Sequence, residues 1–209
     1  MVCFRDLPQA MTLLRTPAQA DLFSAPASLP EGLVYQPEFL TRAEEAALLE
    51  VIGHLPLEAM RYRGFTARRR VASFGGQYDF DANRLQPTAP LPPSLQPLRR
   101  KAAAWMGVAP EAFTHALVAQ YQEGTPLGWH RDVPDFEEVV GISLLNEAVL
   151  RFRPYPPREP KRAGVIKLRV APRSIYLLRG PARWAWQHSV APTHALRYSI
   201  TFRTARAAA

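Results

Sequence analysis

The chain has 209 residues, of which 47% are hydrophobic and 21% are charged. This composition is typical of a globular protein with one domain, and a chain of this length can bury a sizeable core without disulfides. Its single cysteine, Cys3, excludes an intramolecular bridge and favours a reducing, cytoplasmic setting. There is no signal-peptide pattern and no apolar run of about 18 residues, so we expect no membrane span.

The formal net charge is +8. A positive electrostatic potential of this kind favours a polyanionic partner, and DNA or RNA is the partner we expect. The alternatives are that basic side chains only keep the protein soluble, or that they reflect an arginine-rich genome. We expect a monomer.

The N-terminal half is predicted to be helical and rich in loops. Residues 1–29 show little periodicity and predict an extension that is partly disordered. Residues 41–52 predict a helix, because Thr41 and Glu44 have the spacing of a capping box and an apolar stripe follows. The segment RRRVASFGGQYDF predicts a basic strand followed by a Gly-Gly turn. A proline-rich loop over 87–97 then leads to a short amphipathic helix over 98–106.

The C-terminal half consists of short β-rich runs, AFTHALVAQY, VVGISLL, AVLRFRP, GVIKLRVA, SIYLLRG and LRYSITFR, separated by Gly, Pro and charged turns. Strands at this spacing favour a sandwich or jelly roll. The predicted fold is therefore mainly β with N-terminal helices, as one domain over 30–209. Its helical and lid part covers about 30–112, and its β core covers about 113–206.

A metal site is predicted by two histidines and one aspartate. His130 and Asp132 are two residues apart, so on a strand both side chains point to one face. A His-x-Asp pair alone is weak and could be a surface turn. His188 follows a later predicted strand and completes a His₂Asp facial triad, which suits Fe(II) and leaves three coordination positions open. Zinc is the alternative metal.

The segment RYSITFR places Arg197, Ser199, Thr201 and Arg203 on one face of a strand and apolar residues on the other. Buried guanidiniums need anionic partners, and a guanidinium matches a carboxylate bidentately. A dicarboxylate such as 2-oxoglutarate offers one carboxylate at each end. The alternative is an edge strand with solvated arginines.

The order His-x-Asp, β-rich run, His and Arg-x5-Arg resembles the AlkB-like family of Fe(II)- and 2-oxoglutarate-dependent dioxygenases. The similar stretch runs from about Phe65 to Arg206 and includes VGISLL, LRFR and RSIYLLRGPARWAWQHSV. The resemblance implies a double-stranded β-helix that uses O2. It also assigns roles to six residues: His130, Asp132 and His188 hold iron, Arg197 binds the distal carboxylate of 2-oxoglutarate, Arg203 supports the metal-chelating end, and Tyr121 bonds the co-substrate. The chain departs from the family at Ala119, where Asn is frequent.

The substrate side is predicted from the segment before the jelly roll. Arg68, Arg69 and Arg70 form a cationic cluster near Phe74 and Tyr78, which resembles the recognition lid of the family's nucleic-acid demethylases. In such a lid the arginines contact phosphates and an aromatic ring holds the flipped base. The alternative is a solvated basic face. Arg183 matches a family arginine that braces the site or contacts substrate. Trp129 is a core residue or a wall of the pocket.

The resulting prediction is an oxygenase that demethylates alkylated bases in DNA or RNA, as in DNA repair. Two alternatives stay open: an oxygenase of the same chemistry that acts on a protein side chain, and a non-enzymatic β-sandwich that binds nucleic acid. The intact triad argues against the latter.

Overall fold

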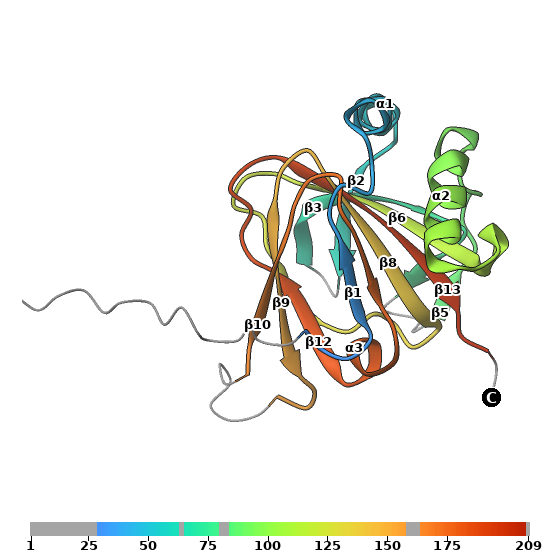
Figure 1. Cartoon of the computed structure of the whole chain (residues 1–209). Helices are drawn as coiled ribbons and strands as arrows, with labels where there is room; N and C mark the ends of the chain where they lie inside the picture. Colours follow the sequence, from blue (N-terminus) through green and yellow to red (C-terminus); the bar gives the residue numbers. More distant parts are fainter. Residues whose placement is uncertain (1–28, 63–64, 80–83, 158–163, 208–209) are drawn as a thin grey trace, which may run out of the picture.

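The structure is a computed structural model that describes residues 29–62, 65–79, 84–157 and 164–207 (Figure 1). The extension predicted over 1–29 lies almost wholly outside these residues. Two antiparallel sheets form the body of the molecule, which is the arrangement of a jelly roll. The predicted mainly-β fold is therefore confirmed.

The larger sheet has seven strands in the order β1 (Leu33–Gln36), β11 (Ile175–Leu178), β8 (Phe136–Leu144), β13 (Arg197–Ala205), β6 (Phe113–Tyr121), β3 (Phe65–Phe74) and β2 (Glu58–Tyr62). The smaller sheet has the order β10 (Ile166–Val170), β9 (Ala148–Pro154), β12 (Trp186–Val190) and β7 (Leu127–His130). A separate hairpin pairs β4 (Gln77–Asp79) with β5 (Arg84–Gln86). In the four-stranded sheet, β7 is therefore an edge strand.

Two helices, α1 (Arg42–Gly53) and α2 (Gln96–Met106), cover the outer side of the larger sheet (Figure 1). Helix α1 begins at the predicted capping box, in which the Thr41 N–H donates to Glu44 Oε2 at 2.7 Å and the Glu44 N–H donates to Thr41 Oγ1 at 3.2 Å. Short 3₁₀ turns over Pro93–Leu95 and Pro110–Ala112 flank α2, and α3 (Gly180–Trp184) precedes β12. No helix in the described part of the chain is long and apolar enough to cross a bilayer.

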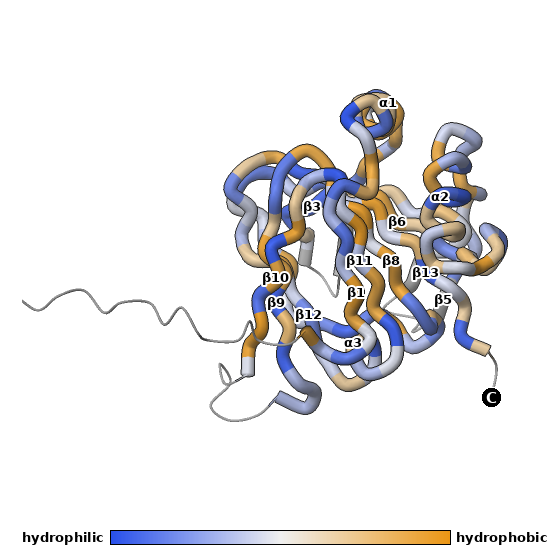
Figure 2. Tube along the Cα trace, viewed as in Figure 1, coloured by the Kyte–Doolittle hydropathy of each residue, from blue (hydrophilic) through white to orange (hydrophobic). Residues whose placement is uncertain are grey.

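The core has two parts, because the larger sheet is apolar on both faces. Figure 2 shows the hydrophobic stretches along strands β8 and β11 of this sheet. Its outer face packs against α1 and α2 through residues such as Ile52, Leu98 and Phe202. Its inner face packs against the smaller sheet through residues such as Phe152 and Leu178. Continuous apolar runs such as VVGISLL in β8 are buried on both faces for this reason.

The prediction that residues 30–112 are helical and rich in loops is wrong for β1 and β2, which join the larger sheet, whereas β3 confirms the basic strand predicted in RRRVASF. Strand β1 has only four residues, with the exposure pattern of an edge strand. It pairs with β11 in the register Leu33↔Leu178, two residues that are 145 apart in the sequence. A short segment at the edge of a sheet becomes a strand because it pairs with a neighbouring strand, and residue periodicity does not encode that pairing.

Candidate metal and co-substrate site

The three predicted ligands meet between the two sheets. His130 ends β7 and His188 lies opposite it in β12, so the register itself brings the two imidazoles together. A bulge makes this possible: two residues of β7, Gly128 and Trp129, lie between Leu127 and His130, while only Ser189 lies between their partners. The ring centroids of His130 and His188 are 4.2 Å apart.

The donor atoms face one another. One ligand atom from each of His130, Asp132 and His188 lies within 4.8 Å of the other two. His130 Nδ1 is 2.9 Å from the Gly128 carbonyl oxygen, so that nitrogen must carry the proton and Nε2 is left as the ligand atom. His188 Nε2 is 3.5 Å from Asp132 Oδ2. The set can therefore converge on one ion.

The carboxylate of Asp132 has two different oxygens. Oδ1 accepts from Arg203 Nε and Nη2, each at 2.7 Å. Oδ2 is buried and has no hydrogen-bond partner among the described residues. A buried carboxylate oxygen without a hydrogen-bond partner lowers the stability of the fold by about 1–3 kcal/mol. A divalent cation between Oδ2 and the two imidazoles supplies the missing partner, so these residues fit Fe(II).

Electrostatics keep all three ligands in the form that binds metal. Burial lowers the pKa of His130 and lowers that of His188 to about 3, which favours the neutral imidazole in both. Burial alone would raise the pKa of Asp132, but the charge of Arg203 lowers it well below its usual range. A neutral imidazole and an ionised carboxylate are the ligating forms.

A buried histidine that the sequence did not single out supports Arg203. Arg203 Nη1 is 3.1 Å from His115 Nδ1, and because a guanidinium can only donate, Nδ1 is the acceptor. The imidazole proton is therefore on Nε2, which donates to Ser73 Oγ at 3.0 Å, and the Ser73 hydroxyl donates to the Gly76 carbonyl at 2.7 Å. A chain of hydrogen bonds thus links the turn after β3 to the metal ligand Asp132, with Arg203 donating to Asp132 on one side and to His115 on the other.

Arg197 is the second arginine of the site. Only 2% of it is exposed, it donates from Nη2 to Ser143 Oγ at 3.1 Å, and its guanidinium lies 4.9 Å from the centroid of the Tyr121 ring. Its Nε has no partner, and no carboxylate of the described residues forms an ion pair with it. Burial lowers its pKa. A buried guanidinium without an anion has the chemistry of a carboxylate-binding pocket.

The walls of this pocket are two tyrosines. Tyr121, 3% exposed, pairs directly with Arg197 across β6 and β13. Tyr176 of β11 was not predicted; its phenol is buried, and that burial raises its pKa. The Tyr176 ring lies over Gly141, where a Cβ atom would come within 2.2 Å of the ring. The signal was the glycine inside the apolar run VVGISLL, since glycine within a strand indicates a close approach.

The departure at Ala119 leaves a small, 2% exposed methyl group where the family has Asn. Ala119 pairs with Ser199 of β13, which in turn pairs with Ser143 of β8. Two buried hydroxyls therefore lie across the sheet from this position, close to Arg197. They are the hydrogen-bonding groups that the chain offers there.

Arg183 in α3 is 2% exposed, and its Nη2 donates to the carbonyls of Asp132, Val133 and Phe136 at 3.2, 2.8 and 2.8 Å. The guanidinium therefore fixes the loop that carries the ligand Asp132. This buried position fits the bracing role rather than contact with substrate.

The three arginines of the predicted lid do not share one face. In β3, Val71 and Ser73 pair with Ala119 and Leu117 on the metal side, whereas Ala72 and Phe74 face the helices. Alternation places Arg69 on the metal side, and its charge is felt at His130. Arg68 and Arg70 have the opposite parity, and Arg70 Nη2 donates to the Leu57 carbonyl at 2.5 Å.

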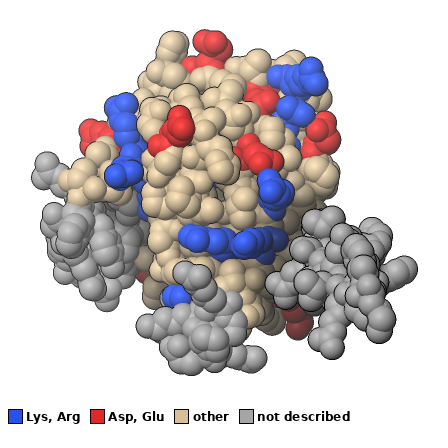
Figure 3. Space-filling model, turned by 90° about the vertical axis from the view of Figure 1, so that its left-hand side faces the viewer, with Lys and Arg blue, Asp and Glu red and all other residues tan. Residues whose placement is uncertain are grey.

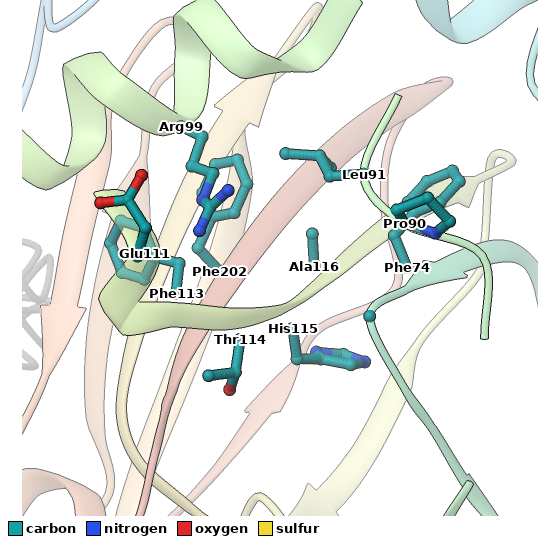
Figure 4. Close-up of a pocket in the computed structure, with 11 residues that line it drawn as sticks. Phe74, Pro90, Leu91, Arg99, Glu111, Phe113, Thr114, His115, Ala116 and Phe202 are labelled. Atoms are coloured by element: carbon teal, nitrogen blue, oxygen red, sulfur yellow. The ribbon is translucent and has the colours of Figure 1, made fainter. Parts of the chain in front are cut away.

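Phe74 requires a correction. It was predicted to stack on a base, but it is 7% exposed and belongs to the core under the helices. It also lines a pocket of about 350 Å³ beside α2, where Figure 4 shows Arg99 and Phe202 on one side and Phe74 with Pro90 on the other. Tyr78 lies in β4, and its side chain is outside the described part of the structure.

Comparison with known families assigns the chain. The model of the 2OG-Fe(II) oxygenase superfamily matches residues 32–203, so the chain belongs to this superfamily. The family's iron and 2-oxoglutarate correspond to the triad of His130, Asp132 and His188 and to the anion-free Arg197. The predicted class of enzyme and its cofactors are confirmed at this level.

Two curated relatives are AlkB homologues, which confirms the resemblance to that group. The chain is 26% identical over 170 residues to a tRNA (carboxymethyluridine(34)-5-O)-methyltransferase, alkbh8, of Xenopus tropicalis, covering 79% of this chain and 26% of the relative. It is 28% identical over 184 residues to an alkylated DNA repair protein ALKBH8 homolog of Arabidopsis thaliana, covering 78% and 51%. The chain thus spans a quarter to a half of these relatives.

Solved structures share the fold. The structure of OsALKBH1 superposes with a TM-score of 0.66 at 18% identity, covering 85% of this chain and 100% of that one. An oxidoreductase of the 2OG-Fe(II) oxygenase family from Burkholderia pseudomallei gives 0.57 at 19% identity, covering 84% and 86%. At these identities the similarity supports the jelly roll alone.

Proposed function

We propose that this protein is an Fe(II)- and 2-oxoglutarate-dependent oxygenase that demethylates bases in nucleic acid. One observation carries the co-substrate half of this proposal: Arg197 is buried without an anion in the same inter-sheet space as an unpartnered oxygen of Asp132. A 2-oxoglutarate molecule has a carboxylate for the guanidinium at one end and a keto-acid group for the metal at the other.

The residues of the chain have separate tasks. His130, Asp132 and His188 hold the metal, and Arg203 keeps Asp132 ionised and oriented. Arg197 and the hydroxyl groups around it bind the distal carboxylate, which sets the orientation of the co-substrate. The bound iron supplies the oxidising power that activates O2. Phe152 and Tyr176 are buried among the apolar residues between the two sheets.

The reaction balances with these components. An N-methyl base, 2-oxoglutarate and O2 give the free base, formaldehyde, succinate and CO2. One oxygen atom enters succinate as the keto acid loses CO2, and the other is inserted into a methyl C–H bond. The hydroxymethyl group then leaves as formaldehyde, and its hydroxyl proton goes to the ring nitrogen.

Three observations support nucleic acid as the substrate class. The chain has a net charge of +8, which favours a polyanion. Arg69 lies on the metal side of β3. The names of two relatives refer to tRNA and to alkylated DNA repair, and we extend that substrate class to this chain.

The test is incubation with Fe(II), 2-oxoglutarate and O2 in the presence of methylated single- and double-stranded oligonucleotides, followed by mass spectrometry. We expect an oligonucleotide to lose the mass of one CH2 group, because hydrogen replaces the methyl group, together with release of formaldehyde. Uncoupled formation of succinate without any change in DNA or RNA would contradict the proposed substrate class, and peptides with a new hydroxyl group would replace it with protein side chains.

A further inference from the structure

The outer face of the four-stranded sheet has a composition that neither the metal site nor the core requires. Leu150, Phe152 and His188 point inward, so alternation turns their neighbours outward. The outward positions of the described strands are Trp129, Val149, Arg151, Arg153, Lys167, Arg169, Gln187 and Ser189. Four of these side chains are cationic and none is acidic.

The arginines on this face are organised around aromatic rings. The guanidiniums of Arg153 and Arg151 lie 4.5 and 5.3 Å from the centroid of the Trp129 ring. At the end of the same sheet, the guanidinium of Arg131 lies 3.8 Å from the centroid of the Tyr155 ring, which is 43% exposed. We use "basic outer face" for Trp129, Arg131, Arg151, Arg153, Tyr155 and Lys167.

The cations of the basic outer face have no acidic partners. On the same face of the sheet Arg169 pairs with Glu147 and is therefore left out of this set, and Arg173, between strands β10 and β11, pairs with Glu38 and Glu45. Within the described ranges, none of Arg131, Arg151, Arg153 and Lys167 forms an ion pair. Figure 3 looks onto this side and shows a row of Lys and Arg side chains across its lower half, with most of the visible acidic side chains above it.

The metal site and the basic outer face share a strand. Edge strand β7 directs His130 inward and Trp129 outward, and Arg131 follows at once, held by a bond from its Nη1 to the Trp184 carbonyl at 2.9 Å. Because β7 is an edge, a polymer that leaves the metal site can pass over it onto the outer face. The outer face is about 14 Å wide from β7 to β10, because these strands are three spacings of about 4.8 Å apart.

We propose that the basic outer face binds the sugar–phosphate backbone of the same nucleic acid strand whose target base enters the metal site. This inference rests on the proposed function. Arg151 and Arg153 donate from Nε to Ser189 Oγ and Gln187 Oε1. Guanidiniums that have no acidic partner match phosphate oxygens bidentately, and flat rings beside them stack on bases without reading sequence. The surface therefore adds affinity for long strands of any sequence.

The experiment measures binding of unmodified oligo(dT) and oligo(U), of about 5 and about 25 nucleotides, over a range of salt concentrations. The variant is Arg151→Gln/Arg153→Gln/Lys167→Gln. We expect the wild type to bind the long strand more tightly than the short one, and the variant to lose this difference. The slope of log K against log salt should flatten by about 0.7 for each lost phosphate contact, hence by about 2 for three contacts.

Two controls isolate the surface. Arg42→Gln/Arg100→Gln/Arg179→Gln removes the same charge from exposed positions on or beside the helices, and it should keep the length dependence. Arg151→Lys/Arg153→Lys keeps the positive charge but removes the paired N–H donors of the guanidinium. This variant should keep the slope of log K against log salt and lose part of the affinity. Thermal unfolding of every variant establishes that the fold is intact.

The outcomes separate this inference from the proposed function. If the triple variant binds the long strands as the wild type does, the inference is wrong while demethylation of nucleic acid stands. If no oligonucleotide binds the wild type and none is demethylated, the proposed function fails and the inference with it. If the variant loses binding to phosphatidylserine vesicles but not to oligonucleotides, the surface is a lipid site and the inference is again overturned.

Discussion

Arg203 gives two N–H donors to a single oxygen of Asp132, each at 2.7 Å, and leaves the other oxygen to the metal. The pairing divides the carboxylate into an anchored half and a ligating half. It also holds the pKa of Asp132 far below its usual range, so the ligand is ionised whether or not metal is bound. The interaction therefore organises the metal site before the metal arrives.

The first prediction concerns the metal. Replacing His130 by Ala removes one of three ligands, so the protein should bind less than one Fe(II) per chain at a concentration that saturates the wild type, and it should stop consuming 2-oxoglutarate. His194→Ala, at an exposed position, is the matched control and should bind one Fe(II). Anaerobic titration followed by metal analysis measures both, and equal binding by the two variants would remove His130 from the site.

The second prediction concerns the co-substrate. Arg197→Met should raise the KM for 2-oxoglutarate by about a hundredfold or more, because losing one partner of a buried charge pair costs about 3–5 kcal/mol. The same substitution should leave the stability of the ligand-free protein unchanged or increase it, because the buried guanidinium has no anion to lose. Steady-state kinetics and thermal unfolding measure the two effects.

The control for this prediction is Arg169→Met, which removes a solvent-exposed arginine of the smaller sheet that is paired with Glu147. It should leave the KM for 2-oxoglutarate at the wild-type value. A change below about tenfold in Arg197→Met would place the co-substrate outside this pocket.

The third prediction concerns His115. His115→Ala leaves Arg203 Nη1 and the Ser73 hydroxyl without their buried partner, so the anchoring of Asp132 should loosen. Supporting residues of this kind typically contribute 10–100-fold to metal affinity, and we expect about tenfold weaker binding of Fe(II) or of Co(II) as a spectroscopic substitute. His115→Asn keeps an acceptor near the position of Nδ1 and should restore most of the affinity. Equal weakening in both variants would mean that only packing is lost.

Much of this site could be predicted from the sequence because the orientation of its side chains depends on the spacing of residues that are close together in the chain. The spacing of His130 and Asp132 sets their common face, and alternation along RYSITFR sets that of Arg197 and Arg203. The capping box at Thr41 likewise involves neighbouring residues alone. Each of these features is decided within about seven residues, and each was found.

The rest depends on contacts between distant segments. His115 is linked to Arg203 across 88 residues, and only the register of β6 against β13 makes it a neighbour. The arginine-rich sequence around Phe74 predicts that its ring stacks on a substrate base. Alternation of side chains along β3 instead turns the ring toward the helices. Parity follows from pairing with β6, and a one-residue change in register would reverse it.

The fourth prediction concerns Arg183. Arg183→Met leaves three backbone carbonyls of the loop after β7 without the charged Nη2 group that they share, and a hydrogen bond to a charged group contributes about 1.5–3 kcal/mol. We expect the melting temperature to fall by several degrees, together with weaker Fe(II) binding, because the loop carries Asp132. The control is Arg179→Met, which changes an exposed arginine just before α3. A variant as stable as the wild type would contradict the bracing role.

The last prediction separates the three arginines of β3. Arg69 lies on the metal side, so Arg69→Gln should raise the KM for a methylated oligonucleotide several-fold while leaving the KM for 2-oxoglutarate unchanged. Arg68→Gln, at an exposed position of opposite parity, should change neither value. Arg70→Gln removes the bond to the Leu57 carbonyl that ties β3 to β2, so it should lower stability by about 1.5–3 kcal/mol before it affects substrate. Kinetics with varied oligonucleotide, together with thermal unfolding, distinguish the three outcomes. If all three variants raised the KM equally with no loss of stability, the arginines would act as one cationic cluster, and the alternation along β3 would not decide their roles.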